Sequence, residues 1–323
     1  MATRANNRHA MRLIALNGNY ALAEAIAKAV GTPLLSTSVK HFADGEIQIN
    51  IDETVRGDDI FVIQSVDDPV NENFMELMIM LDALRRASAH TINVVMPYYA
   101  YSRADRKTRS REPITAKLVS NLIECGGADR VIALDLHADQ IQGFFDIPVD
   151  HLQGLPLLAK YFEKKHLDNK DDIVVVAPDH NSTKRARALA EYLNAPIAIV
   201  DKRDSSPSVD PLDIIGDVDG RICIIADDLI DTANRMVWSA NSLKAAGAKA
   251  VYGCATHAVF SKGAPEKLQE SIIEQVVVTD SIRVPEEKQF PKLVRLLVAD
   301  LFANAIERIY NNESIHDLFD GKH

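Results

Sequence analysis

The chain has 323 residues, of which 47% are hydrophobic and 25% are charged, and its formal net charge at pH 7 is -10. This length is sufficient for two domains with separate cores, and the composition excludes a disordered chain. No apolar run approaches the roughly 18 residues of a membrane span, and the acidic balance disfavours a nucleic-acid groove, so we expect neither a membrane nor a nucleic-acid partner.

The N-terminal segment and the cysteines both indicate a cytoplasmic protein. The apolar run at residues 13–16 is broken by Asn17-Gly18-Asn19, which makes it too short for a signal peptide. Cys125, Cys223 and Cys254 are odd in number and lack C-x-x-C spacing. We therefore expect neither a disulfide framework nor a zinc site.

Short runs rich in Val and Ile alternate with segments of helical length along the whole chain. The expected strands lie near residues 12–16, 60–64, 92–96, 131–135, 173–177, 197–200, 222–226, 250–254 and 275–279. The expected helices lie near residues 20–30, 71–89, 113–125, 155–166, 182–193, 232–247 and 291–310. Continuous apolar strands separated by helices indicate parallel sheets covered on both faces, so the predicted fold class is α/β. The pattern passes through two cycles with a seam near Pro148 to Pro156, which predicts two similarly built domains.

A basic loop follows the third expected strand. The stretch "YYAYSRADRKTRSREPITAK" (98–117) has only two acidic residues against six basic ones, which are Arg103, Arg106, Lys107, Arg109, Arg111 and Lys117. In an acidic chain such a loop favours a lid over a polyphosphate, with nucleic-acid binding as the competing interpretation. The glycine-rich motifs G-x-x-x-x-G-K-[ST] and G-x-G-x-x-G are absent, so a nucleotide must be held by another device.

Two polar clusters follow expected strands, where open parallel sheets bind their ligands. Asp135 and His137 are two residues apart, so on an extended segment both would point toward one metal or phosphate, although a structural histidine is the alternative. Asp179 precedes a helix whose first turns carry Lys184, Arg185 and Arg187. Basic residues there oppose the helix dipole, which indicates either an anion site or a solvated basic face. Asp179 could supply a carboxylate to Mg²⁺ or be an ordinary turn residue.

A third cluster, "IIADDLIDTANRMVWSA" (224–240), has three carboxylates at the end of an expected strand: Asp227, Asp228 and Asp231. Carboxylates accept hydrogen bonds from ribose hydroxyls, and the amides after Asp231 would face a 5'-phosphate at the start of the next helix. Asp231 or Thr232 could equally be a plain N-cap, but capping does not require the two upstream carboxylates. The cluster therefore predicts a sugar-phosphate site.

Together these residues resemble the ribose-phosphate diphosphokinase family, also called phosphoribosyl pyrophosphate synthetases, from about Leu13 to Phe319. The family's blocks match in order: "HFADGEIQINI", "VRGDDIFVIQS", "NENFMELMIMLDALRRASA", "SRADRKTRSREPITAKLVSNL", "DLHADQIQGFFDIPVDHL" and "IVDKR". The resemblance implies two phosphoribosyltransferase-like domains, at 8–152 with a basic lid at 98–112 and at 153–295. It also implies a C-terminal helix at 296–311 that packs back on the N-terminal domain. The active site would lie at the carboxyl ends of the strands and be completed by a neighbouring subunit of a homo-oligomer, with a hexamer as the family-based expectation.

The resemblance also implies a reaction: the β,γ-diphosphoryl group of ATP is transferred to the C1 hydroxyl of ribose 5-phosphate with release of AMP, with Mg²⁺ as cofactor. Carried over by position, the ATP contacts are Asp44, Gly45, Glu46, Arg103 and Ala104. The metal positions are His137 and Asp179, and Lys202 is the catalytic lysine on a mobile loop. The ribose-phosphate loop comprises Asp227, Asp228, Asp231, Thr232, Ala233, Asn234 and Arg235.

This chain departs from the family pattern at four places in ligand-facing segments. Asn234-Arg235 replaces Gly-Thr, Asn181-Ser182 replaces two glycines, Ala104 replaces Gln, and Asp204 replaces a basic residue. Asn234 would keep a left-handed turn if the backbone requires one there. Arg235 could grip the 5'-phosphate, pair with Asp204 or be solvated.

Two functions remain open. The first is an active diphosphokinase with altered substrate handling, and the second is a poorly active or silent paralogue that binds nucleotide as a regulatory subunit. A phosphoribosyltransferase is disfavoured because the basic lid and the Asp44-Gly45-Glu46 segment have no role in it.

Overall fold

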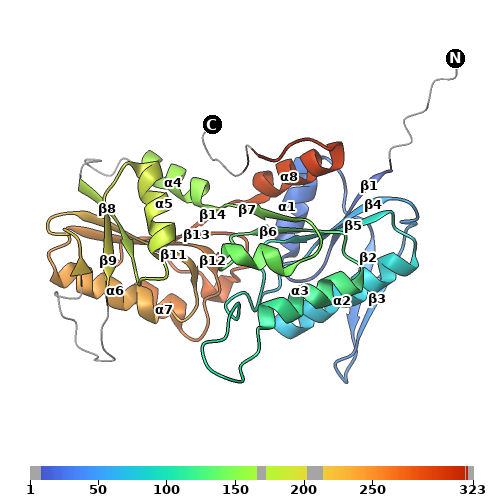
Figure 1. The fold of residues 1–323 in the computed structure, drawn as a ribbon, viewed down its shortest axis with the longest axis horizontal. Coiled ribbons are helices and arrows are strands. Elements are labelled where there is room, and N and C mark those ends of the chain that lie inside the picture. The colour runs from blue at the N-terminus through green and yellow to red at the C-terminus, as the bar shows by residue number, and fades with distance from the viewer. Residues whose placement is uncertain (1–8, 166–171, 202–213, 317, 319–323) are drawn as a thin grey trace, which may run out of the picture. The chain divides into compact units, whose positions relative to one another are not determined.

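The computed structural model describes residues 9–165, 172–201, 214–316 and 318 (Figure 1). The chain divides into two compact units. Unit 1 consists of Met1–Gln153 together with Val298–His323, and unit 2 is Gly154–Leu297. Unit 2 is therefore inserted between two segments of unit 1.

Unit 1 is built on a five-stranded sheet in the order β1-β4-β5-β6-β7, in which every neighbouring pair is parallel. Its strands are β1 (Met11–Ala15), β4 (Asp59–Ile63), β5 (Thr91–Met96), β6 (Arg130–Leu134) and β7 (Val149–Leu152). Its helices are α1 (Tyr20–Val30), α2 (Val70–Arg86), α3 (Thr115–Gly126) and α8 (Ala299–Asn311), with a 3-10 helix at Asp139–Phe144. Helices α1 and α8 cover one face of the sheet, and α2 and α3 cover the other (Figure 1).

A separate hairpin lies beside this sheet. Strands β2 (Thr37–His41) and β3 (Ile47–Ile51) pair antiparallel, with His41 opposite Ile47. The hairpin packs against α2, and the turn at its tip is largely exposed.

Unit 2 contains a seven-stranded sheet in the order β10-β9-β8-β11-β12-β13-β14, in which only the β9–β10 pair is antiparallel. Its strands are β8 (Ile173–Ala177), β9 (Ile197–Val200), β10 (Ile214–Ile215), β11 (Ile222–Ile230), β12 (Ala250–Ala258), β13 (Val276–Thr279) and β14 (Leu293–Leu296). Its helices are α4 (Leu155–Lys164), α5 (Thr183–Leu193), α6 (Asn234–Ala245) and α7 (Ala264–Glu270), with a 3-10 helix at Glu286–Lys288.

The core of unit 2 lies on both faces of its sheet. One buried cluster joins the strands to α4 and α5, and the other joins them to α6 and α7. All nine residues of β11 are buried, as expected for a central strand covered on both sides.

The predicted α/β class, with mainly parallel sheets flanked by helices, is confirmed. One predicted element is partly wrong: residues 291–310 are not one helix, because Leu293–Leu296 form β14 and α8 begins only at Ala299. β14 pairs with β13, so sheet formation overrides the helical spacing of its apolar residues. None of the helices in the described residues combines the length and apolarity needed to cross a membrane.

Candidate functional site

The acidic cluster of unit 2 is assembled by two neighbouring parallel strands. Strands β8 and β11 pair from Ile173↔Ile222 to Val176↔Ile225, so their carboxyl ends meet at the same edge of the sheet. The turn after β8 carries Asp179 and leads into α5, while Asp227 lies in the last part of β11, before α6. The topology therefore brings together the carboxylates of Asp179 and Asp227, which are 48 residues apart in the sequence.

Arg235, in the first turn of α6, joins these two carboxylates. One terminal nitrogen of its guanidinium, Nη1, donates to Oδ2 of Asp179, and the other, Nη2, lies 2.8 Å from Oδ2 of Asp227. The side chain of Asp227 is 7% exposed, that of Asp179 is 26% exposed and that of Arg235 is 49% exposed. The predicted pairing of Arg235 with Asp204 falls outside the described residues, and the solvated interpretation is wrong because both terminal nitrogens are engaged.

Ser182 reinforces the same contact. Its hydroxyl oxygen lies 3.0 Å from Oδ1 of Asp179 and 3.2 Å from Oδ1 of Asp227, and its backbone N–H donates to Asp179 Oδ1 at 2.9 Å. Ser182 is one of the residues that replace glycine in the family pattern. Two of this chain's departures thus meet on the same pair of carboxylates.

The electrostatics of the cluster are dominated by burial. Burial raises the pKa of Asp227 to about 7, the Arg235 guanidinium opposes this shift, and the Asp228 carboxylate adds to it. Burial lowers the pKa of Arg235, but the attraction of Asp227, Asp179 and Asp228 outweighs it and leaves that pKa raised.

Another part of the predicted ribose-phosphate loop, Asp231, is held by hydrogen bonds with Ser261. Asp231 accepts a hydrogen bond from the Ser261 hydroxyl, and its backbone carbonyl accepts from the Ser261 N–H at 3.0 Å. The N-cap of α6 is Ala233, with φ 61°, and no side chain caps this helix. Neither Asp231 nor Thr232 is therefore the N-cap, contrary to the alternative considered from the sequence.

Asn234 does not adopt the left-handed conformation for which it was considered. The positive φ belongs to Ala233, and Asn234 is the first residue of α6. The Asn234 side-chain oxygen accepts from Lys267 Nζ at 2.8 Å. Asn234 is therefore tied to α7 by its side chain rather than required by a turn.

The two predicted metal positions lie in different units. Asp179 belongs to unit 2, and His137 is exposed in unit 1. The extended segment expected around His137 is wrong, because β6 ends at Leu134 and Asp135 is buried with φ 41°. Within the described residues, no group of three His, Cys, Asp or Glu side chains is arranged to hold a metal ion. In unit 2 the Arg235 guanidinium donates to both Asp179 and Asp227, so these carboxylates already have a cationic partner and do not fit a divalent ion in this arrangement.

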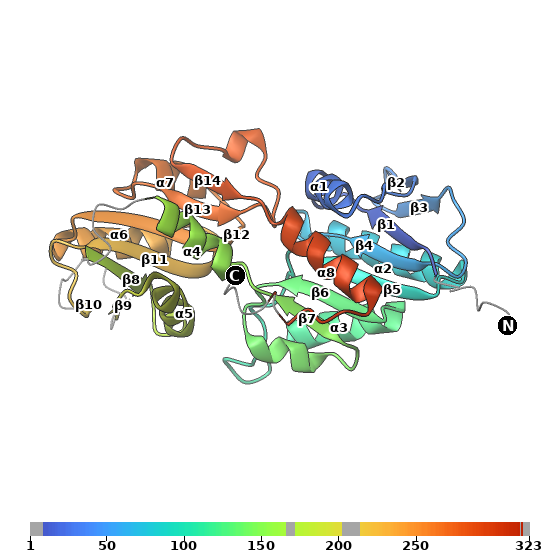
Figure 2. The same ribbon diagram turned by 90° about the horizontal axis from the view of Figure 1, so that it is seen from above.

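The predicted ATP contacts lie on two separate elements of unit 1. Asp44, Gly45 and Glu46 form the exposed turn of the β2–β3 hairpin, where Gly45 has φ 92° and Asp44 Oδ1 accepts from the Glu46 N–H at 3.1 Å. Arg103 is exposed in the loop after β5, and the Ala104 N–H donates to the Tyr101 carbonyl at 2.9 Å. The hairpin turn and this loop lie apart in both views (Figures 1 and 2). Within unit 1, the structure does not bring the two halves of the predicted ATP site together.

The basic loop is held in shape by one of its two carboxylates. Oε2 of Glu112 accepts from the N–H and hydroxyl of Thr108 and from the N–H of Arg109, at 2.9, 2.7 and 2.9 Å. Lys117 belongs to α3 and donates to the Phe144 carbonyl, so it is not a free cation of the lid.

A buried carboxylate that the sequence analysis did not single out positions the hairpin. Glu76 of α2 is 1% exposed and lies 2.8 Å from His41 Nε2 at the end of β2. The backbone and side-chain nitrogens of Asn17 and the Gln64 amide also donate to it. The signal was present, because Glu76 interrupts the apolar face of α2 beside Leu77 and Met80, where an unpaired charge would be costly.

Lys202 and Asp204 lie outside the described residues, so the predicted catalytic lysine stays a prediction. The segment leading to it is anchored: Asp201 Oδ1 lies 2.8 Å from His180 Nε2, next to Asp179. His180 and Asp201 therefore connect the end of β9 to the acidic cluster.

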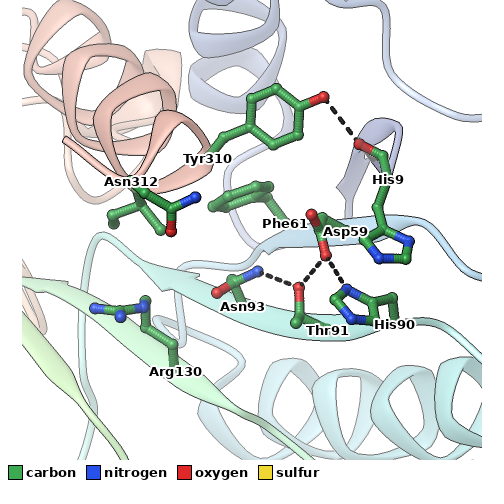
Figure 3. Close-up of a pocket in the computed structure, with 10 residues that line it drawn as sticks. His9, Asp59, Phe61, His90, Thr91, Asn93, Arg130, Tyr310 and Asn312 are labelled. Carbon is green, nitrogen blue, oxygen red and sulfur yellow. Dashed lines mark hydrogen bonds and ion pairs between the residues drawn. The ribbon is translucent and has the colours of Figure 1, made fainter. Parts of the chain in front are cut away.

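A cavity of about 640 Å³ lies beside α8 in unit 1. It is lined by residues that include His9, Asp59, His90, Arg130, Tyr310 and Asn312 (Figure 3). Asp59, Thr91 and Arg130 begin β4, β5 and β6, so this cavity is at the amino ends of the strands. None of the predicted site residues lines it.

Comparison with known proteins decides the family. The chain is 58% identical over 313 residues to the ribose-phosphate pyrophosphokinase of Bacillus caldolyticus, which covers 97% of this chain and 98% of that protein. The chain belongs to the ribose-phosphate pyrophosphokinase family. A family model described as the N-terminal domain of ribose phosphate pyrophosphokinase matches residues 11–127, and one described as a phosphoribosyl synthetase-associated domain matches residues 203–320.

Other relatives agree with membership of the ribose-phosphate pyrophosphokinase family. The Bacillus subtilis (strain 168) ribose-phosphate pyrophosphokinase is 54% identical over 96% of this chain and 97% of its own length. A Lactiplantibacillus plantarum protein named putative ribose-phosphate pyrophosphokinase 2 is 57% identical over 96% of each chain. The crystal structure of phosphoribosylpyrophosphate synthetase from Mycobacterium smegmatis superposes with a TM-score of 0.90 at 41% identity, covering 94% of this chain and 99% of that one. The family and enzyme class predicted from the sequence are confirmed.

Proposed function

We propose that this chain transfers the diphosphoryl group of ATP to C1 of ribose 5-phosphate, giving 5-phosphoribosyl 1-diphosphate and AMP for nucleotide biosynthesis. The observation that carries the proposal is the arrangement of polar groups at the end of β11. The carboxylates of Asp227, Asp228 and Asp231 lie at this end, directly before α6, a helix without a side-chain cap. Carboxylates accept from sugar hydroxyls, and free amides at a helix start bind phosphate. Near-complete relatives named ribose-phosphate pyrophosphokinase support the same reaction.

Each predicted residue has a physical role in this reaction. Diphosphoryl transfer needs its reactants aligned and the charge on the moving group offset, and it needs little covalent chemistry from the protein. Lys202, which follows the anchored Asp201, would supply a cation to the transferred group. Arg103 and the other exposed cations of the basic loop would face the phosphates of ATP.

Magnesium is the proposed cofactor, because a divalent cation offsets the negative charge of a polyphosphate. His137 is its proposed contact in unit 1. Asp179 is the expected contact in unit 2, but its carboxylate is paired with Arg235 in this structure, so it can bind the ion only after Arg235 has left.

A homo-oligomer explains the divided ATP site, and we propose a hexamer on the family pattern. The hairpin turn with Asp44, Gly45 and Glu46 lies apart from Arg103 within unit 1, so a neighbouring subunit would complete the site. Helices α2 and α3 expose large apolar side chains that suit a contact between copies: Met75, Leu118 and Leu122. We keep 8–152 and 153–295 as the proposed ranges of the two domains and a cytoplasmic location as a proposal. The returning helix was expected at 296–311, but it begins at Ala299, because Leu296 belongs to β14.

A second function is favoured by one observation, the engagement of Asp179 and Asp227 by Arg235. Under it the chain binds nucleotide but turns over slowly or not at all, and acts as a regulatory subunit. Loss of sugar binding with retained ATP binding would be its signature.

The deciding experiment mixes the full-length chain with ATP, Mg²⁺ and ribose 5-phosphate and measures AMP. Equimolar AMP and 5-phosphoribosyl 1-diphosphate would support the first function. AMP at background across a wide range of ribose 5-phosphate, with ATP binding intact by calorimetry, would reject it and support the second.

A further inference from the structure

Asp179, Ser182, Asp227 and Arg235 form a cluster, called here the Arg235 cluster, in which the side chains are hydrogen-bonded to one another. Both terminal guanidinium nitrogens of Arg235 point at carboxylates of two different segments, and Ser182 lies between the other oxygens of the same carboxylates. A threonine at 235 and a glycine at 182, the residues of the family pattern, would leave both carboxylates available to other partners. The contact is thus made by the residues in which this chain differs.

We propose that Arg235 is a built-in cation that binds Asp179 and Asp227 in place of a divalent metal ion and thereby lowers the affinity of this site for both the metal and ribose 5-phosphate. The inference deepens the proposed function, since it concerns the substrate site of that reaction. The same residue is therefore a determinant of how strongly this chain binds its sugar substrate.

The geometry explains why the competition is direct. Asp227 is 7% exposed, and a buried carboxylate must keep a cationic or hydrogen-bonding partner. A planar guanidinium reaches two carboxylates at once, whereas threonine offers a single hydroxyl and no charge. A sugar hydroxyl or a metal ion approaching Asp227 must first displace that partner.

The exposure of Arg235 makes the contact reversible. Its side chain is 49% exposed, so the guanidinium can leave toward solvent when a stronger cation arrives. Ser182 stays with the carboxylates, because its backbone N–H and hydroxyl both bind Asp179. The site therefore opens at the cost of two charge-assisted hydrogen bonds rather than by unfolding of the loop.

The phosphate-grip model makes the opposite prediction. If Arg235 held the 5'-phosphate, its removal would weaken ribose 5-phosphate binding. In the structure its terminal nitrogens face carboxylates rather than the start of α6, which favours the competition model.

The test compares the full-length wild type with Arg235→Thr, using Mn²⁺ as the metal probe and ribose 5-phosphate as the sugar probe. Mn²⁺ binding is followed by electron paramagnetic resonance and sugar binding by calorimetry, without ATP. Arg235→Thr should bind both probes at least about tenfold more tightly, since two charge-assisted bonds no longer compete. Unchanged affinity for both would overturn the proposal, and weaker sugar binding would replace it with the phosphate grip.

Arg221→Thr is the matched control. Arg221 precedes β11 at the opposite end of the same strand and pairs with Asp217 at 3.4 Å. Its replacement should leave both affinities at the wild-type value. If Arg235→Thr unfolds, Arg235→Lys replaces it in the test. Lysine keeps the positive charge but lacks the two terminal nitrogens that reach both carboxylates, so this variant should bind both probes more tightly than the wild type. Wild-type affinity in Arg235→Lys would reject the proposal.

The outcome is separable from that of the proposed function. These affinities are measured without turnover, so they decide the role of Arg235 even if no AMP is formed. Conversely, an active wild type with unchanged probe binding in Arg235→Thr would leave the diphosphokinase function standing and reject only the competition.

Discussion

The hydroxyl of Tyr310, near the end of α8, donates a 2.9 Å hydrogen bond to the backbone carbonyl of His9, just before β1 (Figure 3). This bond joins parts of unit 1 that are separated by the whole of unit 2 in the sequence. Around it, α8 packs against α1 and buries Phe302, Ala303 and Ile306. The C-terminal helix is thus a structural part of unit 1.

Replacing Phe302 with alanine should therefore destabilise unit 1 strongly. Phe302 is fully buried, and deleting a buried aromatic ring typically costs about 3–5 kcal/mol in the free energy of unfolding. Tyr310→Phe removes only an exposed hydrogen bond and should cost about 0.5–1 kcal/mol. Denaturant unfolding of both variants measures the difference, and equal losses would contradict the placement of α8.

His41→Ala should weaken ATP binding. His41 connects β2 to the buried Glu76, so its loss frees the hairpin that carries the predicted ATP contacts. We expect the KM for ATP to rise by about tenfold while the KM for ribose 5-phosphate changes little, in keeping with the loss of one hydrogen bond to a charged group. His90→Ala is the control, since His90 makes a similar 2.7 Å pair with Asp59 at the opposite edge of the sheet. Equal effects of the two variants on ATP would show that the hairpin anchor is not involved.

The shape of the basic loop should depend on ionised Glu112. Hydrogen bonds from the Thr108 hydroxyl and from the Arg109 and Thr108 amides lower the pKa of Glu112. A lowered pKa means that the ionised form stabilises the loop above the ordinary glutamate pKa, and that this contribution is lost as pH falls through the lowered value. Glu112→Gln should accordingly speed tryptic cleavage at Arg106–Arg111 at neutral pH. Acidification through the lowered pKa should reduce the protection of the Thr108 and Arg109 amides, measured as their exchange rates relative to the intrinsic rate at the same pH.

The control for this loop is Asp82→Asn, which breaks an exposed pair with Arg86 on α2. It should leave cleavage within the loop unchanged. A Glu112→Gln variant that resists trypsin as well as the wild type does would mean that other contacts order the loop.

A single thiol should react quickly in the native protein. Burial raises the pKa of both Cys223 and Cys254 to about 12, so neither forms the reactive thiolate near neutral pH. Cys125 is exposed at the end of α3. Titration with a disulfide reagent at pH 8 should show one fast thiol, lost in Cys125→Ser, and all three after denaturation. More than one fast thiol would contradict the burial of the other two.

The sequence predicted the repeating architecture well and the partners of individual side chains poorly. Continuous apolar runs predicted the central strands of both sheets, because burial on both faces leaves a strong local signal. The hairpin β2–β3 and the edge strands β7, β10 and β14 were missed, since short strands at sheet edges depend on partners that a local pattern does not reveal.

For the candidate site, too, the sequence predicted where residues lie better than it predicted their partners. The position of Asp227 at a strand end was predictable, because strand ends follow from the alternation of elements. The partner of Arg235 was not, because Asp179 is distant in sequence and becomes a neighbour only through the pairing of β8 with β11. Glu76 was passed over for the same reason: its partners come from three other segments.

The division of unit 1 into two chain segments affects synthesis on the ribosome. Unit 2 is one continuous stretch, Gly154–Leu297, and can finish folding as soon as it has emerged. After its first segment is complete at Gln153, unit 1 must still wait for α8, so the apolar surface of α1 stays uncovered while roughly half of the polypeptide is being made. At about 5–20 residues added per second, this interval from Gln153 to the end of α8 lasts roughly 8–30 seconds. Over this period the nascent chain presents a site that a chaperone or a second nascent copy can bind, and premature termination before α8 yields a product whose first unit cannot close.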